Sequence, residues 1–576
     1  MFYYLYMKGW LRVNNEYKKW LNKTDLEPSL AEALKAMDDE SITDAFYKPV
    51  SFGTGGMRGI MGAGINRINV VTLRKAAYGF ARFLMETYAD AKTRGVAIAY
   101  DNRKDSDVFA KVCVEVLAHF GIRSFLFENI RPTPLLSYAV KTLHACGGIV
   151  ITASHNPPEY NGFKIYDEDG CQLVPEYADR VVEFVNQVDD IFAIERLPFD
   201  VALSEGLVEM LGRKIDNAYI EDVKTVQFHP RDKKTIKVVF TPLHGASREI
   251  GLRCLSECGY EVIPVEEQMI ADNQFKTVKS PNPEDQDAFE YAIRYGNMHQ
   301  ADLLVATDPD GDRVGFAVRH DGKYVFLDGN QTGAIFIHYI LDTLKEEGRL
   351  PEHGIIYNTI VTSDFGLQIA KTYGVDVHST LTGFKFIGEQ MKRIEKTPQT
   401  FLMGYEESYG YIIKDFVRDK DAHQAMVLAC EIANRLKAEG QTLIDYLLAL
   451  YDQFGAYATD LVNIGLKGQA GEQKIQAIMT MFRAYLPETF AGSKVCFKED
   501  YLKQLRFEDD HESVLDYPTS DVLKFVLSGD DWFVLRPSGT EPKLKVYIAV
   551  KEQSLDAAKA RVEVIKAAIM QKIDKI

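Results

Sequence analysis

The stretch Gly147-Gly148-Ile149-Val150-Ile151-Thr152-Ala153-Ser154-His155-Asn156-Pro157-Pro158 joins a short apolar run to a polar turn. The run is rich in β-branched residues and predicts a buried strand that delivers Ser154 to its end. The two prolines make the exit rigid, because a residue before proline is pushed out of the helical region. Ser154 is therefore a candidate nucleophile, although an ordinary strand-to-loop exit would show the same residue types.

Predicted strands alternate with predicted helices along most of the chain. Strands are predicted at 95–100, 124–127, 147–151, 236–240, 261–265, 301–306, 354–358, 375–378 and 401–404, with helical patterns between many of them. Such alternation indicates βαβ units and mostly parallel sheets. From about residue 457 the alternation weakens, and a strand at 531–535 precedes a polar loop. This last part is predicted to be a smaller α+β domain.

The fold class predicted is α/β, with three successive mixed α/β domains of similar topology and a smaller C-terminal α+β domain. A chain of 576 residues is long enough for several domains. The expected boundaries are 1–205 with the Ser154 loop, 206–325, 326–455 and 456–576. A helix at 10–21 is expected to dock on the first domain, after a frayed stretch at 1–9.

Composition narrows the classes of partner and compartment. The net charge of −16 argues against a nucleic-acid partner, and no apolar run of membrane-spanning length is present. The seven cysteines are scattered without a Cys-x-x-Cys pair, as is typical of a reducing compartment. The first residues lack the basic leader of a secretory signal. A cytoplasmic protein is expected.

The motif Asp308-Pro309-Asp310-Gly311-Asp312 places three carboxylates at every second residue after a predicted strand. Oxygen ligands of this kind favour a hard cation such as Mg²⁺ or Ca²⁺. An EF-hand is excluded. If Asp308 is counted as the first position of the calcium-binding loop, the sixth position is Arg313 rather than glycine and the twelfth is Arg319 rather than glutamate. A solvated acidic turn is the alternative, but a cation would remove the repulsion among the three charges.

Further loops carry groups suited to sugars and phosphates. In the glycine-rich stretch 52–64, free backbone amides and Arg58 suit a phosphate, but the stretch fits neither a Rossmann nor a Walker pattern. Thr382-Gly383-Phe384-Lys385 and Tyr405-Glu406-Glu407-Ser408 offer paired donors and acceptors for vicinal hydroxyls. Arg536-Pro537-Ser538-Gly539-Thr540 is a candidate anion cradle. Taken singly, each also fits an ordinary polar or flexible loop.

Taken in order along the chain, these motifs resemble those of the α-D-phosphohexomutase superfamily. The matching stretches are Phe-Gly-Thr-Gly-Gly-Met-Arg-Gly, Thr-Ala-Ser-His-Asn-Pro, Asp-Pro-Asp-Gly-Asp-Arg, Glu-Glu-Ser and Arg-Pro-Ser-Gly-Thr-Glu-Pro. The resemblance runs from about residue 50 to 550. It is closest to the phosphoglucomutase and phosphopentomutase branch, through the runs 61–67 and 406–411. The resemblance implies four domains around one cleft.

The resemblance also implies roles for individual residues. Ser154 would be the phosphoserine, and Asp308, Asp310 and Asp312 would hold Mg²⁺ that also contacts the phosphoryl group on Ser154. Lys164 and Arg58 match the acid/base and charge-stabilising positions, with His155 as a further catalytic residue. The implied substrate-binding residues are Arg313, Thr382, Gly383, Lys385, Glu406, Ser408, Arg536, Ser538, Gly539 and Thr540. Tyr405 departs from the commonest family pattern, which has glycine there.

The reaction implied is the interconversion of glucose 1-phosphate and glucose 6-phosphate through a phosphoserine and a sugar bisphosphate. Glucose 1,6-bisphosphate would act as activator, and the partners would be small sugar phosphates, with no nucleic acid and no membrane. A closed cleft and Arg58 would lower the pKa of Lys164 toward that of a general base. A phosphopentomutase, a Mg²⁺-dependent sugar phosphatase and a non-enzymatic sensor of sugar phosphates remain alternatives. Either a monomer or a homodimer is compatible with the sequence.

Overall fold

The computed structural model describes residues 2–53, 56–466, 468–509, 511–538 and 543–576. The chain forms two compact units. The first contains Met1–Phe326, Ile387–Thr397 and Ser408–Lys437, and the second contains Leu327–Phe386, Pro398–Glu407 and Ala438–Ile576. Three mixed α/β regions and a C-terminal β-rich region are present, so the predicted fold class is confirmed. The four domain boundaries stay predictions.

The first sheet of the first unit has seven described strands. Their order is β1 (Phe52–Gly53), β2 (Gly56–Ile60), β6 (Tyr160–Tyr166), β5 (Gly147–Ile151), β3 (Val96–Tyr100), β4 (Ser124–Phe127) and β7 (Val208–Leu211). The neighbouring strands β5, β3, β4 and β7 are parallel to one another. The strands β6, β2 and β1 are antiparallel to their neighbours. The prediction of a mostly parallel sheet is therefore wrong for this half. The link from β5 to β6 is too short for the crossover that a parallel strand needs.

Helices cover this sheet and enclose its core. They are α2 (Pro28–Lys35), α3 (Asp39–Phe46), α4 (Val70–Thr87), α5 (Ala91–Arg94), α6 (Ser106–His119), α7 (Thr133–Leu143), α8 (Pro175–Asn186) and α9 (Phe199–Ser204). α4 starts at a capping box formed by Asn69 and Thr72, which satisfies amides that would otherwise lack partners. The predicted N-terminal helix is α1 (Phe2–Leu21), which begins at Phe2 rather than at residue 10. Its Trp20 is fully buried and packs edge-on against Phe46 and Phe192, so the predicted docking is confirmed.

The second sheet of the first unit has the order β12 (Lys323–Leu327), β11 (Val314–His320), β10 (Leu303–Thr307), β8 (Lys237–Thr241) and β9 (Glu261–Pro264). β10, β8 and β9 are parallel, and β11 returns antiparallel to β10. The associated helices are α10 (Arg213–Lys224), α11 (Ser247–Glu257) and α12 (Glu290–His299). β16 (Gly410–Ile412) and α16 (Ala422–Ala438) follow later in the chain, almost entirely within this unit.

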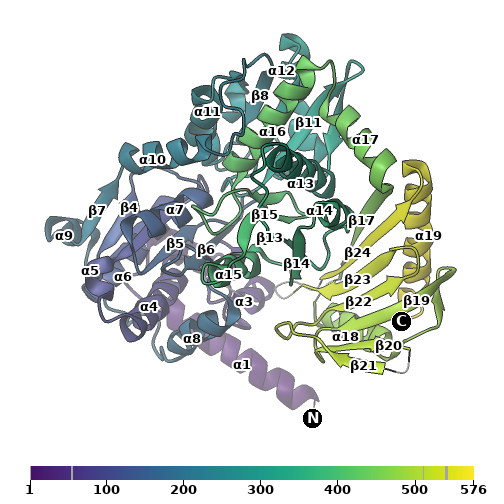
Figure 1. The fold of residues 1–576 in the computed structure, drawn as a ribbon. Coiled ribbons are helices and arrows are strands. Elements are labelled where there is room, and N and C mark those ends of the chain that lie inside the picture. The colour runs from purple at the N-terminus through teal and green to yellow at the C-terminus, as the bar shows by residue number, and fades with distance from the viewer. Residues whose placement is uncertain (1, 54–55, 467, 510, 539–542) are drawn as a thin grey trace. The chain divides into compact units, whose positions relative to one another are not determined.

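The second unit contains β14 (Asp376–Thr380), β13 (Gly354–Thr359) and β15 (Thr400–Glu406), which are parallel. Its helices here are α13 (Gly329–Glu346), α14 (Phe365–Thr372) and α17 (Leu443–Phe454), and α15 (Phe384–Ile394) begins in this unit. The C-terminal sheet runs β17 (Ala456–Gly465), β24 (Lys543–Glu552), β23 (Trp532–Pro537), β22 (Leu523–Leu527), β19 (Ser493–Asp500), β20 (Leu505–Glu508) and β21 (His511–Val514), and β18 (Thr489–Phe490) pairs with β19. Figure 1 shows β24, β23 and β22 side by side in this sheet.

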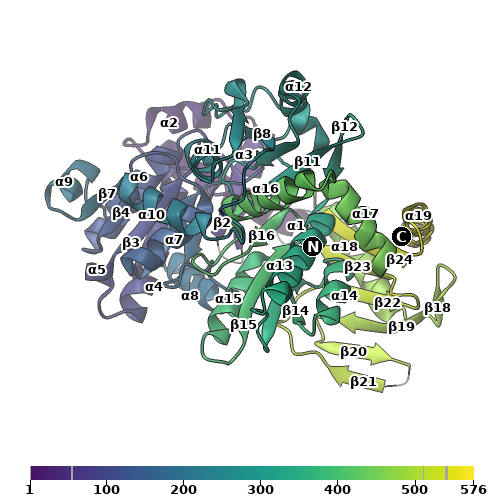
Figure 2. The same ribbon diagram turned by 45° about the horizontal axis from the view of Figure 1, so that its top comes forward.

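The C-terminal sheet shares a core with the residues that follow strands β13 and β14 of its own unit. α18 (Gly468–Ala484) and α19 (Leu555–Ile573) contribute to the core of the sheet, and β20 and β21 form a hairpin at its edge (Figure 2). A second apolar cluster joins Ile360 and Leu381 to Trp532 and Tyr547. The Trp532 indole also donates a hydrogen bond of 2.9 Å to Asp364. Among the described residues, no helix is long and apolar enough to cross a membrane.

Replacement of Gly79 by valine should destabilise the first unit. An added Cβ at Gly79 would lie 2.4 Å from Cγ2 of Val185 and 3.0 Å from the Val181 carbonyl oxygen, so α4 and α8 would have to separate. Overpacking of this kind costs about 1–3 kcal/mol. Gly79→Val should lower the melting temperature in a thermal melt. The control is Gly465→Val, where an added Cβ meets nothing within 4 Å; equal effects of the two changes would contradict the packing argument.

Candidate active site

Ser154 follows the buried strand β5, as predicted. Its backbone is left-handed, with φ of 52°, and the residue is only 3% exposed. The Ser154 hydroxyl donates a hydrogen bond of 2.6 Å to Oδ2 of Asp308 and lies 3.1 Å from Nδ1 of His155. The candidate nucleophile and the candidate metal loop therefore meet directly, although they are 154 positions apart in the chain.

Arg103 holds the Ser154 loop in this conformation. Its guanidinium donates to four backbone carbonyl oxygens of the loop, those of Ser154 at 2.6 Å, Asn156 at 2.5 Å, Pro157 at 2.8 Å and Tyr160 at 3.0 Å. Arg103 is itself buried, with Nε 3.3 Å from Asp101. Arg103 is not among the site residues predicted from the sequence. The available signal was its place after β3, because the ends of neighbouring parallel strands meet at one edge of the sheet.

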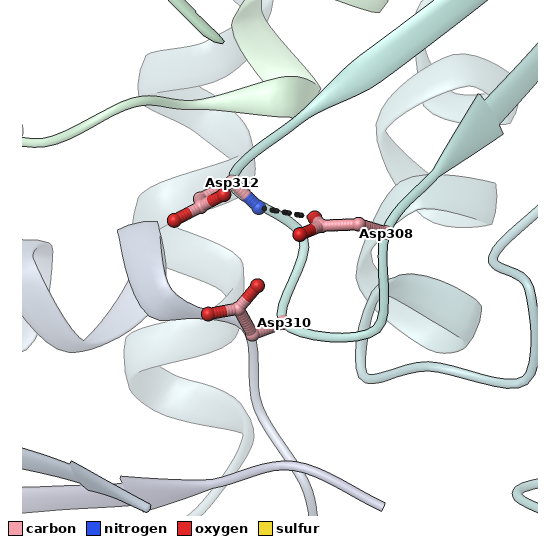
Figure 3. Close-up of side chains that lie close together, drawn as sticks. All are labelled: Asp308, Asp310 and Asp312. Atoms are coloured by element: carbon pink, nitrogen blue, oxygen red, sulfur yellow. Dashed lines mark hydrogen bonds between the residues drawn. The ribbon is translucent and has the colours of Figure 1, made fainter. Parts of the chain in front are cut away.

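The three aspartates after β10 form a buried acidic triad. Asp308, Asp310 and Asp312 each offer a carboxylate oxygen, and these oxygens lie within 4.8 Å of one another. Figure 3 shows the three carboxylates gathered around the turn, with the Asp312 amide donating to Oδ1 of Asp308 at 3.1 Å. Burial and the carboxylates of Asp310 and Asp312 raise the pKa of Asp308 well above its usual value. Stable charge on all three groups requires compensating cations nearby.

The donor set of the triad fits a hard divalent cation. All three ligands are carboxylates, and the Oδ1 atoms of Asp310 and Asp312 are buried without a hydrogen-bond partner among the described residues. Oxygen-only donors are the ligands that Mg²⁺ prefers, and buried carboxylate oxygens are costly when left unpaired. The triad could therefore hold Mg²⁺, with the Ser154 hydroxyl beside it.

Two ammonium groups lie against the triad. Nζ of Lys164 is 2.8 Å from Asp310 and 3.5 Å from Asp312, and Nζ of Lys420 is 3.2 Å from Asp312. Burial disfavours the ammonium of Lys164, but Asp310 and Asp312 outweigh this effect and raise its pKa. The lowered pKa expected for Lys164 is wrong in direction, because the amine contacts carboxylates. Burial is the largest single influence on the pKa of Asp310 and raises it, but Lys164, the hydrogen bond with Asp308 and Lys420 together lower it, so the net shift is downward.

Lys164 lies on a strand rather than on the Ser154 loop. It belongs to β6, opposite Gly56 of β2, and Arg58 stands opposite Gly162 in the same pair of strands. A Cβ on Gly162 would lie 2.6 Å from the carbonyl oxygens of both Met57 and Thr152, so only glycine allows this close approach. The backbone of β2 and β6 thus places Arg58 and Lys164 at the same end of the sheet as Ser154.

Arg58, Arg313 and His155 lie near the Ser154 loop, and Ser408 belongs to the same unit. Nη1 of Arg58 donates to the Asn156 side chain at 2.8 Å. Arg313 follows the triad and forms an ion pair with Glu284. Burial, followed by repulsion from Arg313 and Arg58, lowers the pKa of His155 well below its usual value. The imidazole of His155 is therefore neutral near pH 7, and its Nδ1 lies 3.1 Å from the Ser154 hydroxyl, whose one hydrogen is donated to Asp308. Ser408 belongs to the same unit and is half-buried.

The second unit brings some of the predicted sugar-binding residues together. Glu406 ends β15, and its Oε1 accepts a hydrogen bond of 2.8 Å from the Gly383 amide, next to Thr382. Lys385, on α15, is buried with its Nζ 5.2 Å from the centre of the Phe386 ring. The loops at 382–385 and 405–408, separate in the sequence, therefore do meet at Glu406.

The predicted phosphate cradle is described in part. Arg536 lies on β23, and its Nη1 is within 3.4 Å of the Tyr547 hydroxyl. The Ser538 amide donates a hydrogen bond of 2.8 Å to the carbonyl of Lys543. Gly539 and Thr540 lie outside the described residues. The cradle stays a prediction that rests on Arg536 and Ser538.

Tyr405, which departs from the family pattern, is a core residue of the second unit. Tyr405 is 1% exposed. Its side chain packs against Gly333 and Gly366 so closely that a Cβ added at either glycine would lie within 2.4 Å of a Tyr405 side-chain atom. Alternate residues of a strand point to opposite faces, so Tyr405 faces helices α13 and α14 while Glu406 faces the other way. The tyrosine is explained by packing.

Comparison with known proteins extends these observations. Four models of the phosphoglucomutase/phosphomannomutase family match the chain: alpha/beta/alpha domain I at 49–191, domain II at 217–322, domain III at 328–454 and the C-terminal domain at 469–567. The chain belongs to this family. It is therefore an enzyme of the isomerase class, and the resemblance seen in the sequence is confirmed.

Relatives and solved structures of the family cover nearly the whole chain. A phosphoglucomutase of Staphylococcus aureus (strain MRSA252) is 35% identical over 558 residues, which are 96% of this chain and 98% of the relative. The open form of parafusin, a phosphoglucomutase from Paramecium, matches with TM-score 0.66 and 18% identity over 91% of this chain and 96% of its own. An N-acetylphosphoglucosamine mutase of Aspergillus fumigatus, solved with GlcNAc-6P and magnesium, matches with TM-score 0.52 and 13% identity over 95% and 99%. Both structures share the fold.

Addition of Mg²⁺ should stabilise the protein through the triad. A ligand that binds only the folded state adds about 2.7 kcal/mol when its concentration is a hundred times its Kd. We expect Mg²⁺ to raise the melting temperature of the wild type and to raise it less in Asp310→Asn, which loses one anionic ligand. Asp376→Asn, on an exposed residue of β14, is the control. An equal rise in all three proteins would place the cation elsewhere.

His155 should stay neutral in the metal-free protein as the pH falls past 6.5. The unfolded chain takes up a proton near its ordinary pKa of about 6.5, and the folded chain only at lower pH. The contribution of His155 to folding stability is thus full above pH 6.5 and is lost as the pH falls through the folded pKa. Histidine NMR titration, assigned with His155→Gln, measures this pKa. A midpoint at or above 6.5 would contradict the environment described.

Proposed function

We propose that the chain interconverts glucose 1-phosphate and glucose 6-phosphate through a phosphoserine at Ser154 and a sugar bisphosphate intermediate. The observation that carries this proposal is the 2.6 Å hydrogen bond between the Ser154 hydroxyl and Asp308 of the acidic triad. This hydrogen bond joins the buried hydroxyl of Ser154 to the acidic triad, whose three carboxylates are suited to Mg²⁺. The curated relatives named phosphoglucomutase support the same sugar.

The proposed chemistry is two phosphoryl transfers in opposite directions. In the first, the bond between Oγ of Ser154 and phosphorus breaks while a bond from the free sugar hydroxyl to phosphorus forms; the sugar hydroxyl loses a proton and Oγ of Ser154 gains one, so the serine hydroxyl is restored. The bisphosphate then turns end for end, and the other phosphate returns to Ser154. Glucose 1,6-bisphosphate acts as activator because it phosphorylates Ser154. Transfer of this kind depends mainly on position and charge rather than on covalent chemistry of the protein.

The residues around Ser154 are suited to stabilise negative charge. Arg103 fixes the loop, and Lys164 and Arg58 supply positive charge at the end of β6 and β2. The raised pKa of Lys164 favours its ammonium form, so we assign it charge stabilisation and proton donation, with proton acceptance in the reverse transfer. When bound at the triad, Mg²⁺ supplies further neutralisation of the phosphoryl oxygens.

Further residues carry groups suited to the rest of the substrate. We assign the sugar hydroxyls to Glu406, Ser408 and the loop at Thr382–Lys385, because carboxylate and hydroxyl groups offer an acceptor and a donor together. We assign the non-reacting phosphate to Arg536, Ser538, Gly539 and Thr540, and Arg313 to the substrate near the triad. A cytoplasmic location is also part of the proposal, since all seven cysteines are free. Either a monomer or a homodimer remains compatible.

A comparison of substrates tests the reaction. With Mg²⁺ and glucose 1,6-bisphosphate, the purified protein should convert glucose 1-phosphate to glucose 6-phosphate with little free phosphate. Conversion of ribose 1-phosphate alone would instead indicate a phosphopentomutase. Steady release of phosphate would indicate a phosphatase, and absence of any turnover would indicate a sensor. Intact-mass analysis should find one added phosphate after bisphosphate treatment in the wild type and none in Ser154→Ala.

The role of Lys164 can be separated from its charge. Lys164→Met should lower turnover by about a hundredfold if the amine acts in proton transfer. Lys420→Met removes the other ammonium that contacts Asp312 and is the matched control, expected to lower turnover less. Similar losses in the two variants would assign Lys164 to charge compensation alone, and near-normal turnover of Lys164→Met would remove it from the mechanism.

A further inference from the structure

The first unit contains a cavity of about 460 Å³ outside the residues assigned to catalysis. It lies among α1, α4, α8, the stretch Pro49–Phe52 and Met57. This volume falls within the range of about 300–1,000 Å³ typical of small-molecule sites. The α1 side of the cavity comes from a segment that precedes the region matched by the family's first domain model, which begins at residue 49.

The walls of the cavity are mostly apolar. Val50, Phe52 and Met57 line one side, and Val182 and Val185 of α8 line another. Polar side chains, among them Arg12, Glu16 and Asn186, interrupt these walls. Sugar hydroxyls buried against the apolar part would lose hydrogen bonds, so the cavity favours a ligand with an apolar body over the sugar phosphates proposed as substrates.

One cationic side chain of the cavity lacks a close partner. Lys75 of α4 is half-buried, and no described residue forms a hydrogen bond or an ion pair within 4 Å with it. Glu16 attracts Lys75 at longer range and Lys19 repels it, while Lys19 is itself paired with Asp190 at 3.2 Å. Burial lowers the pKa of Lys75, which marks an ammonium deprived of water. An anionic group at this position would compensate its charge.

We propose that this cavity binds a small molecule with an apolar body and a single anionic group, the anionic group contacting Lys75 and the body lying against Phe52, Met57 and Val185. Phe52 and Met57 are partners across β1 and β2, and Arg58 follows Met57 directly. The occupant thus contacts the strand pair that carries Arg58. The site is independent of the proposed reaction.

Anilinonaphthalene sulfonate is a suitable probe, because it has aromatic rings and one sulfonate. Fluorescence titration of the full chain should show saturable binding. Lys75→Met should weaken it by about tenfold, the loss of one charge-assisted contact. Val182→Trp should fill the cavity and weaken it further. Lys111→Met, on the exposed face of α6, removes the same charge elsewhere and should leave binding unchanged. Circular dichroism and thermal melts verify that each variant is folded.

Competition identifies the ligand chemistry. Octanoate should displace the probe, octanol should displace it several-fold less well, and glucose 1-phosphate should not displace it. Absence of saturable binding, or the same affinity in Lys75→Met and the wild type, would overturn the proposal. Displacement by glucose 1-phosphate would place the probe in the substrate site and would overturn it as well. None of these readouts depends on catalytic turnover, so failure here leaves the proposed reaction untouched.

Discussion

The repulsion among three buried carboxylates is the constraint on which the first unit depends. Asp308, Asp310 and Asp312 cannot all carry charge in a dry site without compensation, and Lys164 from the first sheet supplies part of it. The two sheets are therefore joined at their functional ends. Thr133 reinforces this junction, since its amide and hydroxyl both donate to Asp310, at 2.8 and 3.1 Å. The same junction brings Ser154 to Asp308, so the packing of the unit and the proposed chemistry have a common origin.

Local sequence patterns predicted the strands that carry the site, but contacts between distant segments decided where several site residues lie. The strands before Ser154 and Asp308 were predictable, because apolar β-branched runs have few alternatives. The strand that carries Lys164 was not predicted, since nothing in the residues after Pro158 shows that they return antiparallel to β5. Arg103 was missed because its four partners are backbone carbonyls, which carry no sequence signal. The pKa of Lys164 depends on residues about 150 positions away, which no local pattern contains.

The boundaries of the compact units do not follow the order of the family domains. Residues 408–437 match the third family domain but belong to the first unit. A buried network explains this: the Tyr219 hydroxyl donates to Asp421 at 2.7 Å, and His423 contacts both Tyr219 and Ser247. Glu431 accepts from the amides of Phe228 and His229. Buried polar groups of this kind are costly to leave unpaired, so this segment is fixed to the second sheet.

The left-handed backbone at Ser154 limits which residue could ever replace it. Threonine carries the same hydroxyl, but a β-branched side chain is a genuine outlier at a φ of 52°. The four carbonyls held by Arg103 leave the loop little freedom to relax toward a conformation that threonine tolerates. The choice between serine and threonine is thus made by chain geometry, whatever chemistry the hydroxyl performs. The backbone at this position therefore selects serine independently of the reaction proposed for it.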